Sequence, residues 1–138
     1  MNPGQLITLI ITLHFIADFN VQMGGRLHDL KCKEWWDAQL KNASDYDKDQ
    51  YKYDYLVALW IHSFVWAAIT FAPILWLAGD KITTWIVFGA NVVMHGMADN
   101  AKANWRCLNL LQDQMFHLAQ IILAVLFFYK TEALKWLM

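Results

Sequence analysis

Residues 13–19 are Leu-His-Phe-Ile-Ala-Asp-Phe, and residues 94–100 are Met-His-Gly-Met-Ala-Asp-Asn. Both stretches contain His-x-x-Ala-Asp, and both lie in apolar surroundings where acidic residues are rare. His and Asp four residues apart lie on one face of an α-helix, about 6 Å apart along its axis. A third apolar segment has the reverse order, with Asp113 before His117. These stretches predict helices that each carry a His/Asp pair on one face.

The composition predicts a membrane protein. Hydrophobic residues make up 58% of the 138 residues, against roughly 45–50% in soluble globular proteins. The net charge is −1 and no basic stripe is present, which argues against nucleic-acid binding. Cys32 and Cys107 lie in different polar segments without a C-x-x-C motif, so both are expected to be free thiols.

Four apolar segments predict an all-α bundle of four transmembrane helices that forms a single domain over residues 1–138. Pro73 is expected to kink the second span without ending it. The first segment lacks the basic start and cleavage site of a signal peptide, so we expect it to be retained, with Gly24 and Gly25 as its helix stop. The predicted spans are residues 5–23, 55–78, 82–104 and 113–129.

The polar connector, residues 24–54, is predicted to lie in the cytoplasm. It contains six Lys or Arg residues, and Lys102 and Arg106 fall on the same side, whereas the opposite side has only three. This bias predicts a cytoplasmic connector and external termini. Apolar residues at 27, 30, 35 and 36 predict a short interfacial helix after the first span, and residues 42–54 predict a solvated loop. His28 and Asp29 are expected at the surface.

With this topology, four helices place four His and three Asp side chains at similar depth near the cytoplasmic face. Imidazole and carboxylate together suit Zn, Mn, Fe or Ni, whereas Ca and Mg do not call for four His. We therefore expect one or two divalent ions, zinc above the others, because paired donors at i and i+4 are known from helix-borne metal sites. The predicted ligands are His14, Asp18, His62, His95, Asp99, Asp113 and His117.

Other interpretations of the same residues stay open. His62 also suits a hydrogen bond between helices, Asp99 and Lys102 suit an ion pair, and Asp113 suits a helix N-terminus. Taken together, the set is also compatible with a structural polar network or a proton or ion relay. The relay is disfavoured because the outer halves of the first two spans offer little polarity beyond Thr8, Thr12 and Thr70.

The motifs also occur in a recognisable order: His14-Phe-Ile-Ala-Asp18 with Gln22, His62, His95-Gly-Met-Ala-Asp99 with Lys102, and Asp113-Gln114-x-x-His117. Outside the connector and the tails, this set resembles an uncharacterised family of small bacterial and phage membrane proteins, the domain of unknown function family 3307. That family's pattern is similar to H-x-x-A-D-F-x-x-Q, a second-span H, H-x-x-x-D-x-x-K and D-Q-x-x-H. The chain departs from it at Gly96 and Asn100 and in its long, acid-rich connector.

The resemblance implies a bacterial inner (cytoplasmic) membrane protein with distant similarity to membrane-bound metal-dependent hydrolases, including one of the SOS response. We expect a metal-binding protein and, if it is an enzyme, a hydrolase. Asp113 and His117 would then bind a second ion or act as the water-orienting base, and Lys102 would hold an anionic group such as a lipid phosphate. Gln22, Asn91 and Gln114 would support the ligands.

The alternative is a non-enzymatic membrane module, possibly phage-encoded. Its metal or polar core would be structural, and its connector would bind a host protein. The expected partners are the lipid bilayer and a membrane protein or a second copy of the chain, without nucleic acid.

Overall fold

The computed structural model describes residues 3–21 and 26–136, in which all the regular secondary structure is helical. The all-α prediction is therefore confirmed. Segment η1 continues α1 in π-helical form. In chain order the elements are α1 (Pro3–Phe15), η1 (Ile16–Val21), α2 (Leu27–Leu30), α3 (Lys33–Gln39), α4 (Asp45–Gln50), α5 (Asp54–Thr70), α6 (Ala72–Ala78), α7 (Ile82–Ala103) and α8 (Leu110–Trp136).

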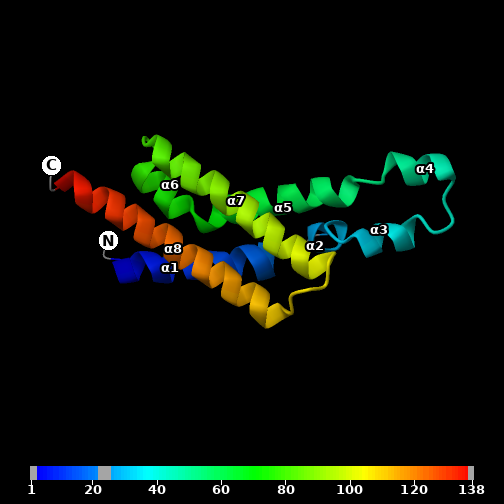
Figure 1. Ribbon diagram of the computed structural model, residues 1–138, viewed down its shortest axis with the longest axis horizontal. Helices are drawn as coiled ribbons and strands as arrows, with labels where there is room; N and C mark the ends of the chain where they lie inside the picture. The colour runs from blue at the N-terminus through cyan, green and yellow to red at the C-terminus, as the bar shows by residue number, and fades with distance from the viewer. Residues whose placement is uncertain (1–2, 22–25, 137–138) are drawn as a thin grey trace.

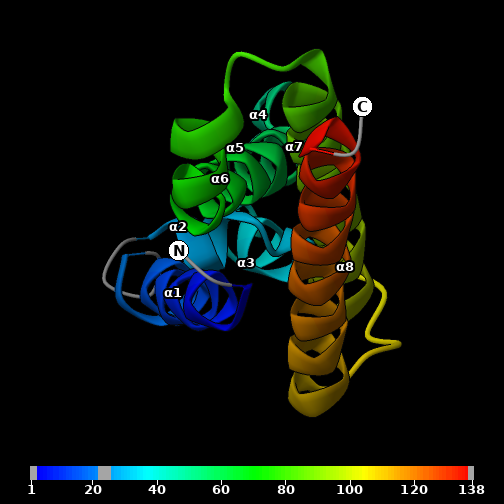
Figure 2. The ribbon, with the colours of Figure 1, turned by 90° about the vertical axis from the view of Figure 1, so that its left-hand side faces the viewer.

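Helices α1, α5, α7 and α8 form an elongated bundle (Figure 1). In Figure 1, α7 and α8 lie side by side with the same inclination, and α1 and α5 run closer to the long axis. Helix α7 contacts both α5 and α8, while α1 contacts α5 and α8. Figure 2, seen from the end that holds both chain termini, shows α1 and α8 as separate sides of this bundle. Taken in chain order, the four long helices α1, α5, α7 and α8 run in alternating directions along the bundle (Figure 1).

The helices agree with the predicted spans only in part. Among the described residues, Leu110–Lys130 in α8 is the one helix long and apolar enough to cross a membrane, and α5 with α6 would be a second if the bent pair counts as one span. The apolar helix at Gly4–Phe19 is shorter than that test requires. Four crossings thus stay a prediction, and Gln22, Gly24 and Gly25 lie outside the described residues.

The second predicted span is broken, where the sequence predicted only a kink. Helix α5 ends at Thr70, and α6 begins at Ala72 after a bend of 61°. Pro73 lies in the first turn of α6. Because proline has no N–H for the carbonyl four residues earlier and its ring clashes with that carbonyl, the break falls just before it.

The connector is more ordered than predicted. Helix α4 lies inside the stretch 42–54 that the sequence assigned to a loop. Its N-cap is Ser44, whose Oγ accepts a hydrogen bond from the Asp47 backbone N–H at 3.2 Å. The first N–H groups of a helix have no acceptor within the helix, and Ser44 accepts from one of them. This cap explains why so short a polar helix forms.

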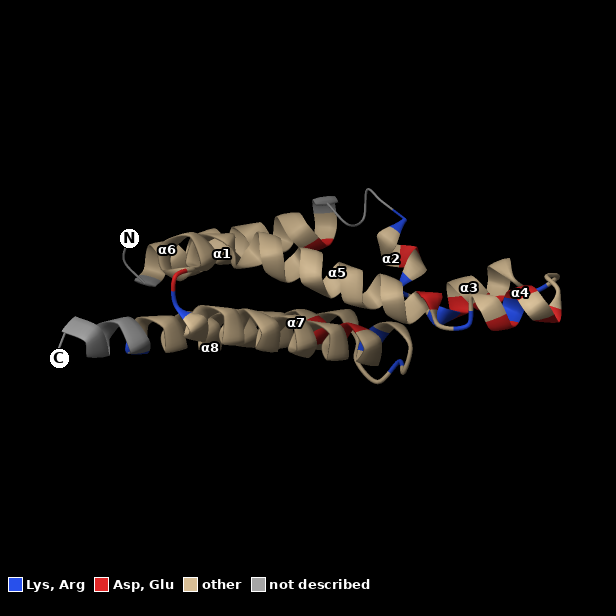
Figure 3. Ribbon diagram, turned by 90° about the horizontal axis from the view of Figure 1, so that it is seen from above, with Lys and Arg blue, Asp and Glu red and all other residues tan. Residues whose placement is uncertain are grey.

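Charge is unevenly distributed along the molecule. Figure 3 shows most charged residues at the end that carries α2, α3, α4 and the α7–α8 turn, whereas the rest of the bundle is almost free of them. We call residues 33–50, which contain α3 and α4, the connector arm; it extends beyond the bundle in Figure 1. The molecule is thus polar at one end and apolar along most of its length.

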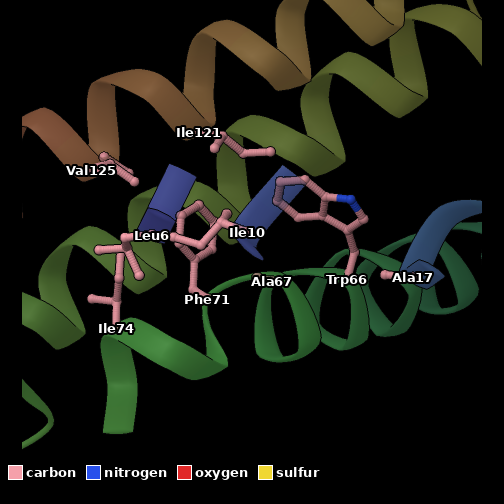
Figure 4. Close-up of a cluster of buried hydrophobic side chains, with 10 residues drawn as sticks. Leu6, Ile10, Ala17, Trp66, Ala67, Phe71, Ile74, Ile121 and Val125 are labelled. Carbon is pink, nitrogen blue, oxygen red and sulfur yellow. The ribbon is translucent and has the colours of Figure 1, made fainter. Parts of the chain in front are cut away.

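The apolar core lies on the side of the bundle nearer the termini. Figure 4 shows the Phe71 ring among side chains from α1, α6 and α8, with the Trp66 indole at the edge of the cluster. Helices α5 and α7 approach closely at Gly96, where an added Cβ would lie 2.9 Å from Ser63 Oγ and 3.0 Å from the Trp60 ring. The buried cluster comprises Leu6, Ile10, Ala17, Trp66, Ala67, Phe71, Ile74, Ile121, Ala124 and Val125.

Candidate metal centre

The structure brings the predicted His and Asp residues together in one layer of the bundle. Helix α1 contributes one His, η1 one Asp, α5 one His, and α7 and α8 one His and one Asp each. Six of the seven side chains are buried, and Asp18 is partly exposed. The layer is formed by His14, Asp18, His62, His95, Asp99, Asp113 and His117.

Asp99 is the central carboxylate of this layer. Its Oδ2 lies 2.7 Å from His62 Nε2 and 3.8 Å from His95 Nε2. Its Oδ1 lies 3.7 Å from His117 Nε2. One carboxylate therefore faces three imidazole rings that come from three different helices.

A lysine completes the surroundings of Asp99, and it is one that the sequence did not single out. Lys31 is only 5% exposed. Its ammonium group donates to Asp99 Oδ2 and lies 3.0 Å from His62 Nε2. From the sequence alone, Lys31 is one of the charged residues of the polar connector. Helix α2 packs against α5, and this packing turns a connector residue into a buried one.

His95 and His117 are in direct contact. Their Nδ1 atoms lie 3.2 Å apart, and between two neutral rings only one Nδ1 can carry the hydrogen. His117 Nε2 faces Asp113 Oδ1 at 3.2 Å, which favours a hydrogen on that Nε2 because a carboxylate only accepts. His95 then donates through Nδ1, and its Nε2 keeps a free lone pair.

Two buried ring nitrogens of the layer, His62 Nδ1 and His95 Nε2, have no hydrogen-bond partner among the described residues. Unpaired buried polar atoms are uncommon in folded proteins, and each one calls for an explanation such as a bound ion or water. Ring nitrogens and carboxylate oxygens are suitable donors to a divalent transition metal.

Two overlapping groups have metal-binding spacing. One is Asp18, His62 and His95, and the other is His95, Asp99 and His117; in each group one ligand atom per residue lies within 4.8 Å of the others. His95 belongs to both. Buried His/Asp groups that can hold a metal ion are therefore present, although Asp99 also takes part in an ion pair with Lys31.

His14 stands apart from these two groups. Its Nδ1 accepts from Trp66 Nε1 at 2.8 Å, and its Nε2 lies 3.1 Å from Gln114 Oε1. Both ring nitrogens are thus used in hydrogen bonds, so the role of His14 as a direct ligand stays a prediction. Gln114 Nε2 donates to Asp18 and Asp113, at 3.3 Å each, which agrees with its predicted supporting position.

Trp66 is a second residue of the layer that the sequence did not indicate. Its ring stacks on His95 with 4.0 Å between centroids and 7° between planes, and its N–H binds His14. In the sequence it looked like one aromatic residue of an apolar span. The available signal was its spacing, because Trp66 follows His62 by four residues and so shares its helix face.

Two other predicted contacts turn out differently. Lys102 pairs with Asp113 Oδ2 at 2.7 Å, whereas the alternative interpretation paired it with Asp99. Asn91 was expected to support the ligands, but its side-chain amide donates to the Val87 carbonyl of its own helix at 2.7 Å. A side chain's sequence spacing gives its helix face but not the partner that it reaches.

A cleft of about 300 Å³ opens beside the layer. Basic and apolar side chains line it together with residues of the layer; the lining comprises His28, Lys31, Lys102, Phe19, Leu110, Asp18, His62, Asp99 and Gln114. Desolvation by neighbouring groups, followed by the charge of Lys31, lowers the pKa of the His28 imidazole even though the residue is exposed overall. His28 is exposed, as predicted for the surface of the connector.

The turn between α7 and α8 fastens the Lys31 segment to the bundle. Asn104 Oδ1 accepts from the Lys33 backbone N–H at 2.8 Å, and Asn104 Nδ2 donates to the Lys31 carbonyl at 3.2 Å. Arg106, with a positive φ of 54°, pairs with Glu34. These contacts fix the segment from Lys31 to Glu34 and so help to hold the Lys31 side chain in the layer.

Comparison with known proteins gives no relative from which to assign a function. No family model matches the chain, and no curated protein or solved structure does. The resemblance of the ordered motifs to a membrane-protein family therefore stays a prediction.

Proposed function

We propose that this chain is a multi-pass protein of the bacterial inner membrane that binds one or two divalent metal ions and acts as a metal-dependent hydrolase. The membrane part rests on the outer faces of the helices. Large apolar side chains are exposed along α5, α7 and α8, in a quantity that is unusual for a soluble monomer. Examples are Trp60, Ile61 and Phe64, Trp85 and Ile86, and Leu123, Leu126 and Phe127.

The proposed orientation follows from the charged end of the molecule. Residues 24–54 together with Lys102 and Arg106 carry eight of the eleven Lys and Arg residues, which favours the cytoplasmic side for this end. The four proposed crossings are α1 with η1, α5 with α6, α7, and α8. The His/Asp layer would then lie toward the cytoplasmic mouth of the bundle.

The metal part rests on one observation above all. His95 Nε2 is buried without a hydrogen-bond partner and lies 3.8 Å from Asp99 Oδ2, and His95 belongs to both groups that have metal-binding spacing. Nitrogen and carboxylate donors in this combination suit zinc first, with manganese, iron and nickel as alternatives. A bound divalent ion lowers the pKa of water and polarises a phosphoryl or acyl oxygen, which is hydrolytic chemistry.

The chain's own residues would have separate roles in such a reaction. Lys102 holds Asp113 Oδ2 at 2.7 Å and leaves Oδ1 facing His117. Asp113 and His117 are thus arranged as a pair that can accept a proton from water. Lys102, whose side chain is 28% exposed, can also neutralise an anionic group in the cleft.

A non-enzymatic module is the second candidate, and a specific observation favours it. Lys31 and Lys102 already neutralise Asp99 and Asp113, so the polar layer is partly satisfied by the protein alone. Its role would then be structural, and the connector arm would bind a partner protein.

Metal analysis separates these two functions. Protein purified in detergent after an alkaline membrane wash, without chelators, should contain about one or two divalent ions per chain by elemental analysis. His95→Gln combined with His117→Gln should remove them, while His28→Gln, outside the layer, should leave them in place. Metal-free wild-type protein that stays folded would support the structural module, and protein released by the wash would contradict the membrane location.

A further inference from the structure

The cleft beside the His/Asp layer has two chemically different walls. We call its basic side chains, Lys31, Lys102 and His28, the basic wall and its apolar ones, Phe19 and Leu110, the apolar wall; Asp18, His62, Asp99 and Gln114 complete the lining. Phe19 is 38% exposed and Leu110 is 56% exposed. A ligand that contacts both walls must have a polar part and an apolar part.

The apolar wall continues onto the outside of the bundle. Phe15 precedes Phe19 by one helical turn and is 44% exposed, and Leu111 and Met115 are exposed near Leu110 on α8. These side chains extend the apolar surface from the cleft along α1 and α8. If the bundle spans a membrane, the cleft is open to the acyl chains of surrounding lipid.

The charge of the layer determines which polar part fits. Three carboxylates, Asp18, Asp99 and Asp113, face two ammonium groups, Lys31 and Lys102, which leaves one negative charge in excess with neutral imidazoles. A bound divalent cation reverses this to one positive charge in excess. An anionic group then becomes the favoured partner, since a buried excess charge is costly without a counter-charge.

We propose that the cleft binds the phosphate ester of an amphiphilic alcohol, with the phosphate against Lys31 and Lys102 and the hydrocarbon against Phe19 and Leu110. This inference rests on the proposed function, because it uses the charge of the bound ion. Hydrolysis would form a bond from the oxygen of water to phosphorus and break the phosphorus–ester oxygen bond. The alcohol leaves with one proton from water, and inorganic phosphate is the other product.

The volume and the position of the lysines suit this class of ligand. About 300 Å³ is at the lower end of the range for small-molecule sites, enough for a phosphate headgroup and the start of a chain, with the rest outside. Lys31 follows the last residue of α2 and Lys102 lies in α7, so two separate segments of the chain would hold the phosphate. Lysine is a common phosphate ligand that acts as a point charge.

The test measures binding and hydrolysis of two phosphate esters by the full chain in detergent with its metal. Phosphatidic acid should bind to the protein, as followed by titration and native mass spectrometry. The protein should also hydrolyse it, and the inorganic phosphate released is the second readout. Glycerol 3-phosphate, which has the same phosphate without the hydrocarbon, should bind about tenfold more weakly or worse, since it leaves the apolar wall uncovered. Equal binding of the two esters would overturn the amphiphilic ligand.

Matched variants test the two walls. Lys102→Gln should weaken phosphatidic acid binding about tenfold or more, and Lys102→Arg should restore part of it. Lys41→Gln, an exposed charge on the connector arm, should have no effect. Leu110→Asn should weaken binding while Leu126→Asn, an equally exposed leucine of α8 outside the cleft, should not; equal effects within either pair would overturn the proposal.

Metal analysis on the same samples separates the two levels of inference. Protein that holds its metal but binds neither ester overturns the ligand assignment and leaves the metal site standing. Metal-free protein overturns the proposed function and, with it, the charge reversal on which the ligand assignment depends. Lys31→Gln is a less suitable variant because the Lys31 side chain is buried in the core, whereas that of Lys102 is 28% exposed; the Lys102 variants therefore carry the test.

Discussion

The His/Asp layer and the connector arm use the same residue types in opposite ways. In the layer, the Lys31–Asp99 pair has side chains 7% and 3% exposed. In the arm, Lys33 and Asp37 pair at 2.7 Å with side chains 54% and 62% exposed. Water screens the second pair but not the first, so the same ionic contact has very different energetic weight in the two places.

The difference shows where the chain holds its charges in fixed positions. A buried ion pair contributes little net stability over an apolar pair of the same size, because both ions lose their hydration. Removing either partner, however, leaves the other charge buried without a counter-charge and lowers the free energy of unfolding. The arm's pairs are replaceable, while those of the layer hold ionisable groups in fixed positions.

The largest expected effect comes from breaking the buried pair. Asp99→Ala leaves Lys31 charged and His62 unsatisfied inside the bundle, and it should lower the free energy of unfolding by about 3–5 kcal/mol. The measurement is equilibrium unfolding in detergent with a chelator present, so that metal loss does not contribute. A loss below about 1 kcal/mol would mean that water reaches Asp99 and that the layer resembles the arm.

A smaller effect should separate packing from charge within the bundle. Gly96→Ala places a Cβ 2.9 Å from Ser63 Oγ and 3.0 Å from Trp60, so it should lower the free energy of unfolding by about 1–3 kcal/mol through overpacking. Gly89→Ala on the same helix meets nothing within 4 Å. It should raise stability by up to about 1 kcal/mol, because alanine favours a helix over glycine. Equal shifts in the two variants would contradict the close approach of α5 and α7.

The smallest effect is expected in the arm. A double-mutant cycle with Lys33→Ala and Asp37→Ala should give a coupling of about 0.5 kcal/mol or less, as for other exposed i,i+4 pairs. Thermal unfolding at low and high salt is the measurement, since screening should remove what coupling there is. Coupling of several kcal/mol that survives salt would show that a partner or a second copy buries the arm.

The sequence predicted correctly that the seven side chains lie in one layer, because two simple rules determine their positions. The i,i+4 rule fixed the face of each helix, and the antiparallel order of the helices fixed their common depth. Both rules are local or follow from the order of segments along the chain. They were enough to gather residues as far apart as Asp18 and Asp113 into one layer.

Lys31 escaped prediction for the opposite reason. Its burial depends on Asn104, some seventy residues later, and on the packing of α2 against α5, neither of which leaves a periodic signal. The partner of Lys102 could not be predicted from the sequence either. Asp99 and Asp113 both lie near it, and side-chain packing determines which of them it contacts. Helix α4 was missed because it depends on one capping residue, Ser44, rather than on an apolar face.

The contacts of Asn104 also set an order of events during synthesis. Lys31 leaves the ribosome 68 residues before Asp99 and 73 residues before Asn104. At roughly 5–20 residues per second, several seconds pass between them. When α7 begins to be made, α1, α2 and α5 have already been synthesised, yet Lys31 has neither its carboxylate nor its anchor. The layer can therefore close only after α7 is made, and a chain that stops before Asn104 would present an ammonium group with no final place to bind.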